Sequence, residues 1–316
     1  MKPTNSIVQK KQEQTFSTAI RSDALQRLMM ESLQDREMVA DLTSVLTSVV
    51  AANEALKKCK PDSIVAAALQ GAVMRLSLPL KQYSIVPYGD TASFQISYQG
   101  YAALAKATGE YDEIDVLDVR EGEYKGKDPR TRKPTFEWID DDDEREKKPI
   151  IGYYAYYDLK DGFSRCLYWT YEKILNHADQ YSQAFNRKKW EDYVAGKIKR
   201  EDIHNNSPWY GLPNSEGHMK MCKKTVLKQL LLDGFAPMST KLMKSIRYDD
   251  LQERGGEVIS ADDSRIVNVS TGEIFDTTAV VVEEPKEEPA PAKKKEAQPK
   301  SDQPAVEQMT LEGMKG

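Results

Sequence analysis

Aromatic, amide and cationic side chains gather in one short stretch of this chain of 316 residues. Two strand-like runs, Tyr83–Pro87 and Ala92–Tyr98, flank turn-forming residues 88–91, and a helix is expected at Gln99–Thr108 with Gly109 as its C-terminal cap. Cations bind phosphates, and planar or amide groups contact sugars and bases, so the stretch suits single-strand binding without sequence readout. The alternative is a small sheet with aromatic core residues and glutamines on its wet face. The candidate nucleic-acid contacts here are Gln95, Tyr98, Gln99, Tyr101 and Lys106.

A second group of cations lies on a helix expected at about residues 216–232. At 100° per residue its four lysines share an arc of about 140°, and its main apolar residues share an arc of about 80° away from them. A helix that packs on a core and faces a polyanion shows this pattern, and so does an ordinary amphipathic surface helix. Residues 187–248 hold 13 Lys and Arg against 6 Asp and Glu, which favours the polyanion. The candidate residues are Lys220, Lys223, Lys224 and Lys228, together with Trp209 just before the helix.

A third group combines cations with one aromatic residue. Arg187, Lys188 and Lys189 directly precede Trp190 in a helix expected at Gln183–Val194. Interleaved cations and aromatic rings can line a groove for a nucleic-acid backbone. A solvated helix face explains the same pattern equally well.

The net charge of −5 conceals an asymmetry along the chain. Residues 249–316 hold 8 basic and 16 acidic residues, a net of −8, so residues 1–248 carry a net of +3. A mildly basic body with an acidic tail is common among nucleic-acid binders. The segment 285–305 is rich in Pro, Ala, Lys and Glu, a composition that predicts disorder.

Other chemistries find little support in the sequence. The acidic run Asp140–Asp143 could bind a divalent metal, but it lacks the glycine spacing of a calcium loop and is better interpreted as a solvated loop. The three histidines are isolated, the three cysteines are far apart, and no GxxxxGK[ST] phosphate loop is present. No apolar run is long enough to span a membrane. We therefore expect no catalytic residues, no metal ligands and a cytoplasmic protein.

The pattern of elements predicts an α+β fold, with antiparallel sheet and hairpins packed against helices. We expect helices at 21–58 and 61–78, strands at 112–120, 150–159 and 163–170, and a helix at 171–179, with a charged loop at 122–148. The predicted domains are a flexible or helical segment 1–40, a core 41–248 and an acidic, largely disordered tail 249–316. The long apolar periodicity of 21–58 also predicts a self-assembly surface.

Two blocks of the chain resemble the RecT family of phage-type single-strand annealing proteins. The first runs from the alanine-rich helix through Val86-Pro-Tyr-Gly89 and Gln95-Ile-Ser-Tyr-Gln-Gly100 to Leu104-Ala105. The second joins Pro208-Trp-Tyr210 to Met219-Lys-Met-Cys-Lys-Lys-Thr-Val-Leu-Lys228. The family often has Lys where this chain has Gln99, so a phosphate contact there is missing or moved.

The resemblance implies ATP-independent binding of single-stranded DNA and annealing of complementary strands in a bacterial host cell. It also implies that the protein assembles into a ring or helical filament and that it binds the annealed duplex as well as the single strand. A partner exonuclease or single-strand-binding protein would be engaged by the tail. No cofactor is required, and a role for Mg²⁺ stays open. Two alternatives from other classes remain: a metal-dependent nuclease or repair enzyme, and a structural oligomeric phage protein.

Overall fold

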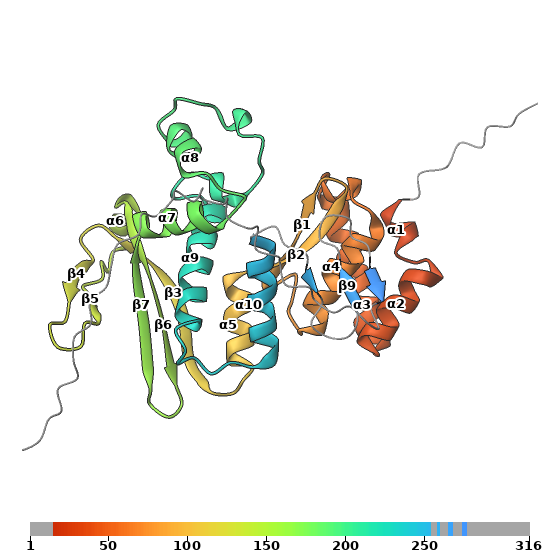
Figure 1. Cartoon of the computed structure of the whole chain (residues 1–316), viewed down its shortest axis with the longest axis horizontal. Coiled ribbons are helices and arrows are strands. Elements are labelled where there is room, and N and C mark those ends of the chain that lie inside the picture. The colour runs from red at the N-terminus through yellow and green to blue at the C-terminus, as the bar shows by residue number, and fades with distance from the viewer. Residues whose placement is uncertain (1–14, 254–257, 260–264, 268–273, 277–316) are drawn as a thin grey trace, which may run out of the picture. The chain divides into compact units, whose positions relative to one another are not determined.

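A computed structural model describes residues 15–253, 258–259, 265–267 and 274–276 (Figure 1). Helices and antiparallel strands alternate as predicted, so the α+β class is confirmed. The helices are α1 Phe16–Ala19, α2 Asp23–Leu33, α3 Arg36–Ala52, η1 Leu56–Lys58, α4 Pro61–Val73, α5 Tyr98–Lys106, α6 Asp142–Lys147, α7 Tyr171–Tyr181, α8 Arg187–Val194, η2 Arg200–Asp202, η3 Pro208–Tyr210, α9 Glu216–Leu231 and α10 Thr240–Glu253. The strands are β1 Tyr83–Tyr88, β2 Thr91–Ile96, β3 Tyr111–Arg120, β4 Tyr124–Lys127, β5 Pro134–Phe136, β6 Ile150–Leu159, β7 Ser164–Thr170, β8 Val258–Ile259, β9 Arg265–Val267 and β10 Ile274–Asp276.

The expected helix at 21–58 is divided near its middle. Gln34 takes a left-handed conformation with φ 54°, which ends α2. Asp35 then caps α3, because its carboxylate accepts hydrogen bonds from the amides of Glu37 and Met38 at 2.8 and 3.2 Å. The helix expected at 61–78 is shorter than predicted, since α4 ends at Val73 and Arg75 is left-handed with φ 63°. Apolar periodicity continued past both breaks and hid them.

The β1–β2 hairpin packs on α4 and leads directly into α5. Gly89 has φ 62° in the turn, a conformation that favours glycine. Ser97 caps α5 by accepting a hydrogen bond from the amide of Gly100 at 3.2 Å. A Cβ at Gly100 would lie 2.1 Å from the carbonyl oxygen of Gln82, so only glycine allows α5 to start this close to the hairpin. The hairpin therefore fixes where the first turn of α5 lies.

A three-stranded antiparallel sheet in the order β3-β6-β7 forms the second part of the scaffold. Side chains alternate along β6: Tyr153, Ala155 and Tyr157 are buried, and Tyr154 and Tyr156 between them are partly exposed. Helices α7 and α9 pack on the sheet, and α5 contacts both β3 and α9. Helix α9 consequently lies between the sheet and α5 (Figure 1).

The prediction of a charged loop at 122–148 is wrong in part, since this segment contains the β4–β5 hairpin and α6. Buried charges hold this region. Glu123 is fully buried and accepts a hydrogen bond from Arg145 Nε at 2.6 Å, while Asp118 accepts one from Arg120 Nε at 2.7 Å. Arg145 belongs to α6, so its ion pairs attach α6 to β3 and the residues that follow it. A count of charges could not reveal that the carboxylates and guanidiniums pair with one another.

Helix α10 is not predicted by the apolar periodicity of the sequence, and it crosses the predicted boundary at residue 248. It packs on α5 and β2. The predicted disorder and the partner-binding role of the tail fall mostly outside the residues that the structure describes. No helix in the described part of the chain has the length and apolarity needed to cross a bilayer.

Candidate nucleic-acid interface

The four lysines of α9 occupy two different environments. Lys220 and Lys223 are partly exposed, whereas Lys224 and Lys228 are only 3% and 4% exposed. Only Lys220 and Lys223 are therefore open to a polyanion, and the predicted lysine face does not include Lys224 and Lys228. Helices α5 and α10 cover the face that carries Lys224 and Lys228.

The exposed pair of lysines lies beside the first turn of α5. The ammonium of Lys223 is 5.7 Å from the ring centre of Tyr98, within cation–π range. Glu216, Lys220 and Lys223 are spaced four and three residues apart and share one side of α9. Glu216 pairs with Lys220 and with Lys81, which precedes the hairpin. We call Lys81, Tyr98, Lys220 and Lys223 the Tyr98 surface.

The Tyr98 surface offers an aromatic ring, cations and the N-terminal end of a helix dipole together. Burial raises the pKa of Tyr98, and the nearby Asp115 and Glu216 carboxylates raise it further, so its phenol stays neutral. These two carboxylates also moderate the positive potential. The arrangement can hold a phosphate beside a ring that stacks on a base or sugar.

The buried pair of lysines shares one carboxylate from α10. Asp249 is 1% exposed and pairs with Lys224 and, at 3.1 Å, with Lys228. The hydroxyl of Tyr101 donates a third hydrogen bond to Asp249 at 2.8 Å. Burial alone would raise the pKa of Asp249, but the charges of Lys224 and Lys228 and the hydrogen bonds hold it below its usual value. This cluster joins α5, α9 and α10.

Trp209 belongs to a buried aromatic cluster at the start of α9. It is 3% exposed and packs against Phe185 and His218, with ring centres 5.3 and 5.6 Å away. His218 Nδ1 lies 2.7 Å from the Trp209 carbonyl oxygen, which can only accept, so Nδ1 carries the proton. Nε2 then accepts from the Tyr171 hydroxyl at 2.7 Å. Burial lowers the pKa of His218, in agreement with this neutral form.

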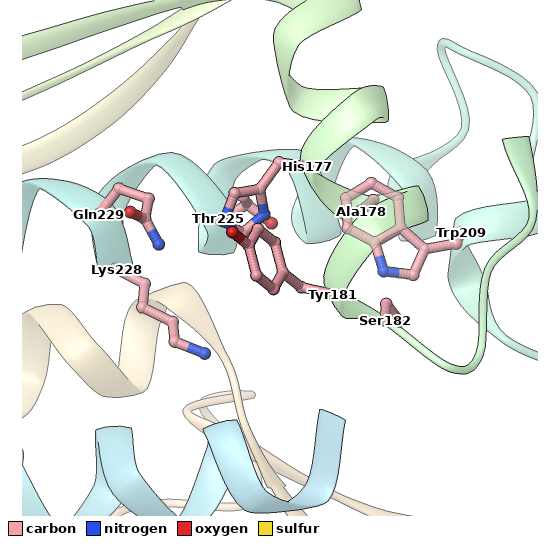
Figure 2. A pocket seen from close by; sticks show the side chains of 8 residues that line it. All are labelled: His177, Ala178, Tyr181, Ser182, Trp209, Thr225, Lys228 and Gln229. Atoms are coloured by element: carbon pink, nitrogen blue, oxygen red, sulfur yellow. The ribbon is translucent and has the colours of Figure 1, made fainter. Parts of the chain in front are cut away.

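A shallow hollow lies between α7, η3 and α9 (Figure 2). It holds about 290 Å³ of empty space, its open mouth included. Burial lowers the pKa of His177 on its wall, and the charge of Lys228 lowers it further. The hollow is therefore lined by aromatic and imidazole rings, two aliphatic hydroxyls, one amide and one lysine. Its lining residues are His177, Ala178, Tyr181, Ser182, Trp209, Thr225, Lys228 and Gln229.

The blocks that meet around α9 match a known family. The model of the RecT family matches residues 40–264, which is more than half of the chain. The chain belongs to the RecT family. It is also 29% identical over 229 residues to the uncharacterized protein YqaK of Bacillus subtilis strain 168, covering 72% of this chain and 70% of YqaK. Membership supports a role in DNA recombination by single-strand annealing, in a family that binds single-stranded DNA and oligomerises.

The remaining sequence-predicted contacts are scattered over this RecT-family chain. Gln95 is partly exposed on β2, and Lys106 is exposed at the end of α5. Gln99 is partly exposed, but its Oε1 is buried without a hydrogen-bond partner among the described residues. Tyr101 is fully buried against Asp249, so its side chain supports the fold here.

On α8, the three predicted cations differ in how they are held. Arg187 donates to Glu191 at 2.7 Å and also to Asn176, so its guanidinium is already engaged. Lys188 and Lys189 are both exposed. Figure 1 shows α8 away from α5 and the β1–β2 hairpin, so these cations form a separate candidate patch.

Acidic groups show no metal-binding arrangement within the described ranges. No group of three or more His, Cys, Asp or Glu side chains there is placed to hold an ion. In the run Asp140–Asp143, Asp141 caps α6 by accepting from the amide of Glu144 at 2.9 Å. That hydrogen bond gives one of the four acids a local structural role.

Two features of the RecT-family fold are not predicted by the sequence pattern. Asp249 was assigned to the tail, although it is the partner of two lysines in the core. The basic segment of the β4–β5 hairpin was assigned to a loop. Its run of cations between Lys125 and Lys133 was the signal that could have singled it out.

Proposed function

We propose that this chain binds single-stranded DNA and anneals complementary strands without ATP. The observation that carries the proposal is the contact between Tyr98 and Lys223. These residues come from the two separate blocks that resemble the RecT family, and the fold brings them together at one partly exposed surface. The sequence also lacks a phosphate-binding loop for ATP.

The protein would make or break no covalent bond in this reaction. Two strands repel each other through their phosphates, and bound cations reduce that repulsion while the bases remain free to pair. Phosphate contacts carry no sequence information, so any complementary pair would be a substrate. The proposal includes assembly into a ring or helical filament in the cytoplasm of a bacterial host, and a partner exonuclease or single-strand-binding protein.

An annealing time course tests the proposal. Two complementary oligonucleotides are mixed with the full chain, with and without ATP and with and without Mg²⁺. We expect pairing faster than in the protein-free control, unaffected by ATP. Pairing at the control rate, or only with ATP, would refute the proposal.

The two alternatives predict different results in the same assay. A nuclease would shorten labelled single strands when Mg²⁺ is added. A structural phage protein would give no salt-sensitive shift of a single-stranded oligonucleotide. Either outcome would replace annealing as the function.

A further inference from the structure

The β4–β5 hairpin is a basic arm on the far side of the sheet from α9. Residues 124–134 contain five Lys and Arg and one Asp, a net charge of +4. All five cations are exposed. Lys125 pairs with Glu137 at 3.0 Å, while the structure gives no carboxylate partner among the described residues to Lys127, Arg130 or Arg132. A polyanion can therefore reach these three cations without breaking an ion pair.

The tip of the arm is held in one conformation by its only acidic residue. Asp128 Oδ1 accepts hydrogen bonds from the amides of Arg130 and Thr131 at 3.0 and 2.6 Å, and from the Thr131 hydroxyl at 2.8 Å. These bonds lower the pKa of Asp128, so its carboxylate stays ionised and keeps these hydrogen bonds. The acid thus orders the loop that displays the arginines.

The base of the arm is attached to the sheet by stacked aromatic rings. Tyr124 stacks on Tyr168 with ring centres 4.6 Å apart, and Phe136 packs on Tyr154 at 4.8 Å. Trp138 stacks on Phe136 at 5.0 Å and keeps 39% of its surface exposed. The guanidinium of Arg145 also lies over this indole, 5.9 Å from its ring centre. The arm therefore combines cations for phosphates with a partly exposed indole that a base can contact.

The sheet separates this arm from the Tyr98 surface. Tyr154 and Tyr168 are cross-strand neighbours whose rings meet the arm. Tyr153, next along β6, is buried on the other side, where it lies near Cys222 of α9. Figure 1 shows the β4–β5 hairpin and α9 on opposite sides of the strands.

We infer that the β4–β5 hairpin binds the phosphate backbone of a second DNA strand while the Tyr98 surface holds the first. The inference rests on the proposed function, because annealing requires two strands on one assembly. Arginine suits the task, since its planar fork binds phosphate oxygens in pairs. The hairpin would raise the local concentration of the incoming strand, so its loss slows annealing more than it weakens binding of the first strand.

The test uses a triple variant of the full chain, Lys127→Ala, Arg130→Ala and Arg132→Asn. Asn replaces Arg132 because its φ is 60°, which Asn tolerates better than most residues. The matched control carries Arg27→Ala, Lys58→Ala and Lys160→Ala, three exposed cations on other parts of the fold, with the same change in net charge. Circular dichroism melting first establishes that both variants are folded.

Two non-complementary oligonucleotides, one with a donor dye and one with an acceptor, measure capture of the second strand by energy transfer. For the hairpin variant we expect first-strand affinity within about twofold of wild type and second-strand capture reduced about tenfold, with a salt slope flatter by about 2. Annealing of complementary strands should slow in parallel. The control variant should behave as wild type does.

Three outcomes would overturn the inference. Unchanged energy transfer would show that the hairpin does not hold the second strand. An equal loss of first-strand binding would make the hairpin part of the first site. Loss of self-assembly with strand capture intact would mean that the arm binds another copy, for example its acidic tail. If wild type itself does not anneal, the proposed function fails, whatever the variant does.

Discussion

Two pairs of lysines on one helix lie in opposite environments. Lys220 and Lys223 reach the surface beside Tyr98, while Lys224 and Lys228 are buried with Asp249. Lys223 and Lys224 are adjacent along the chain, yet a difference of about 100° around the helix axis separates their side chains. The comparison teaches that the charge on a helix face indicates function only after the covering elements are known.

The largest expected effect comes from removing the shared carboxylate. Asp249→Ala leaves two buried ammonium groups without that partner, which should cost about 3–5 kcal/mol of folding free energy. Asp250→Ala is the matched control. Asp250 is partly exposed and pairs with the buried Lys228 alone, which keeps Asp249, so the change should cost less, about 1 kcal/mol. Urea unfolding followed by circular dichroism measures both. Equal losses would erase the distinction between the two lysine environments.

Charge reversal at Lys223 and at Lys224, which are adjacent in the sequence, should have different consequences because only Lys224 is buried. Lys223→Glu should leave the unfolding midpoint near that of wild type and weaken binding of all single strands alike. The plot of log affinity against log salt should flatten by about 0.7 for each phosphate that the variant no longer binds. Lys224→Glu places a second carboxylate beside buried Asp249 and should impair folding instead. Fluorescence anisotropy and thermal melting would contradict the comparison if both variants lost DNA binding while remaining equally stable.

Acid should act on the buried cluster and spare the exposed lysines. The pKa of Asp249 is lowered in the folded chain. Burial by itself would raise the pKa of Asp118. The hydrogen bond from Arg120 and the charges of Arg145 and Arg120 outweigh burial, so the pKa of Asp118 is lowered too. The unfolded chain therefore binds protons more readily, and its population grows on acidification.

The sign of this shift fixes the pH window. The stabilisation is present above the ordinary aspartate pKa of about 4 and is lost as the pH falls through the lowered values. The lowered pKa values of His177 and His218 add a smaller loss that begins below the ordinary histidine pKa of about 6.5. Urea midpoints measured at pH 7, 5, 4 and 3 should therefore fall modestly at first and more steeply below pH 4. A flat series would refute this.

The smallest expected effect concerns the tail. Removing residues 254–316 keeps Asp249 and α10, so annealing of purified oligonucleotides should stay within about twofold of wild type. Ending the chain after Tyr248 removes Asp249 and should destabilise it as Asp249→Ala does. The annealing rates and melting temperatures of the two truncated chains check this. In cells, removing residues 254–316 should still reduce recombination, because we expect the tail to engage a partner.

Local sequence signals located most elements of this chain but not their covering. The strands expected at 150–159 and 163–170 match β6 and β7, and the helix expected at Gln99–Thr108 overlaps α5. Ser97, which was placed in the preceding strand, is the N-cap of α5. The apolar residues at 21–58 were predicted to mediate self-assembly, yet Leu25, Met29 and Leu46 belong to the chain's own core. Deleting the first 40 residues would therefore damage the core as well as any assembly surface, and assembly through this segment stays a prediction.

The sequence alone determined the helix and strand periods, the turn at Gly89 and the two blocks that match the RecT family, because each depends on neighbours within a few residues. Only the tertiary structure decided that Lys224 and Lys228 are buried, since their partner Asp249 lies more than 20 residues away in an element that the pattern did not reveal. It also decided that Tyr98 and Lys223 meet, and that the basic β4–β5 hairpin lies across the sheet from them. The residue type determines a side chain's charge, but its exposure depends on what packs over it.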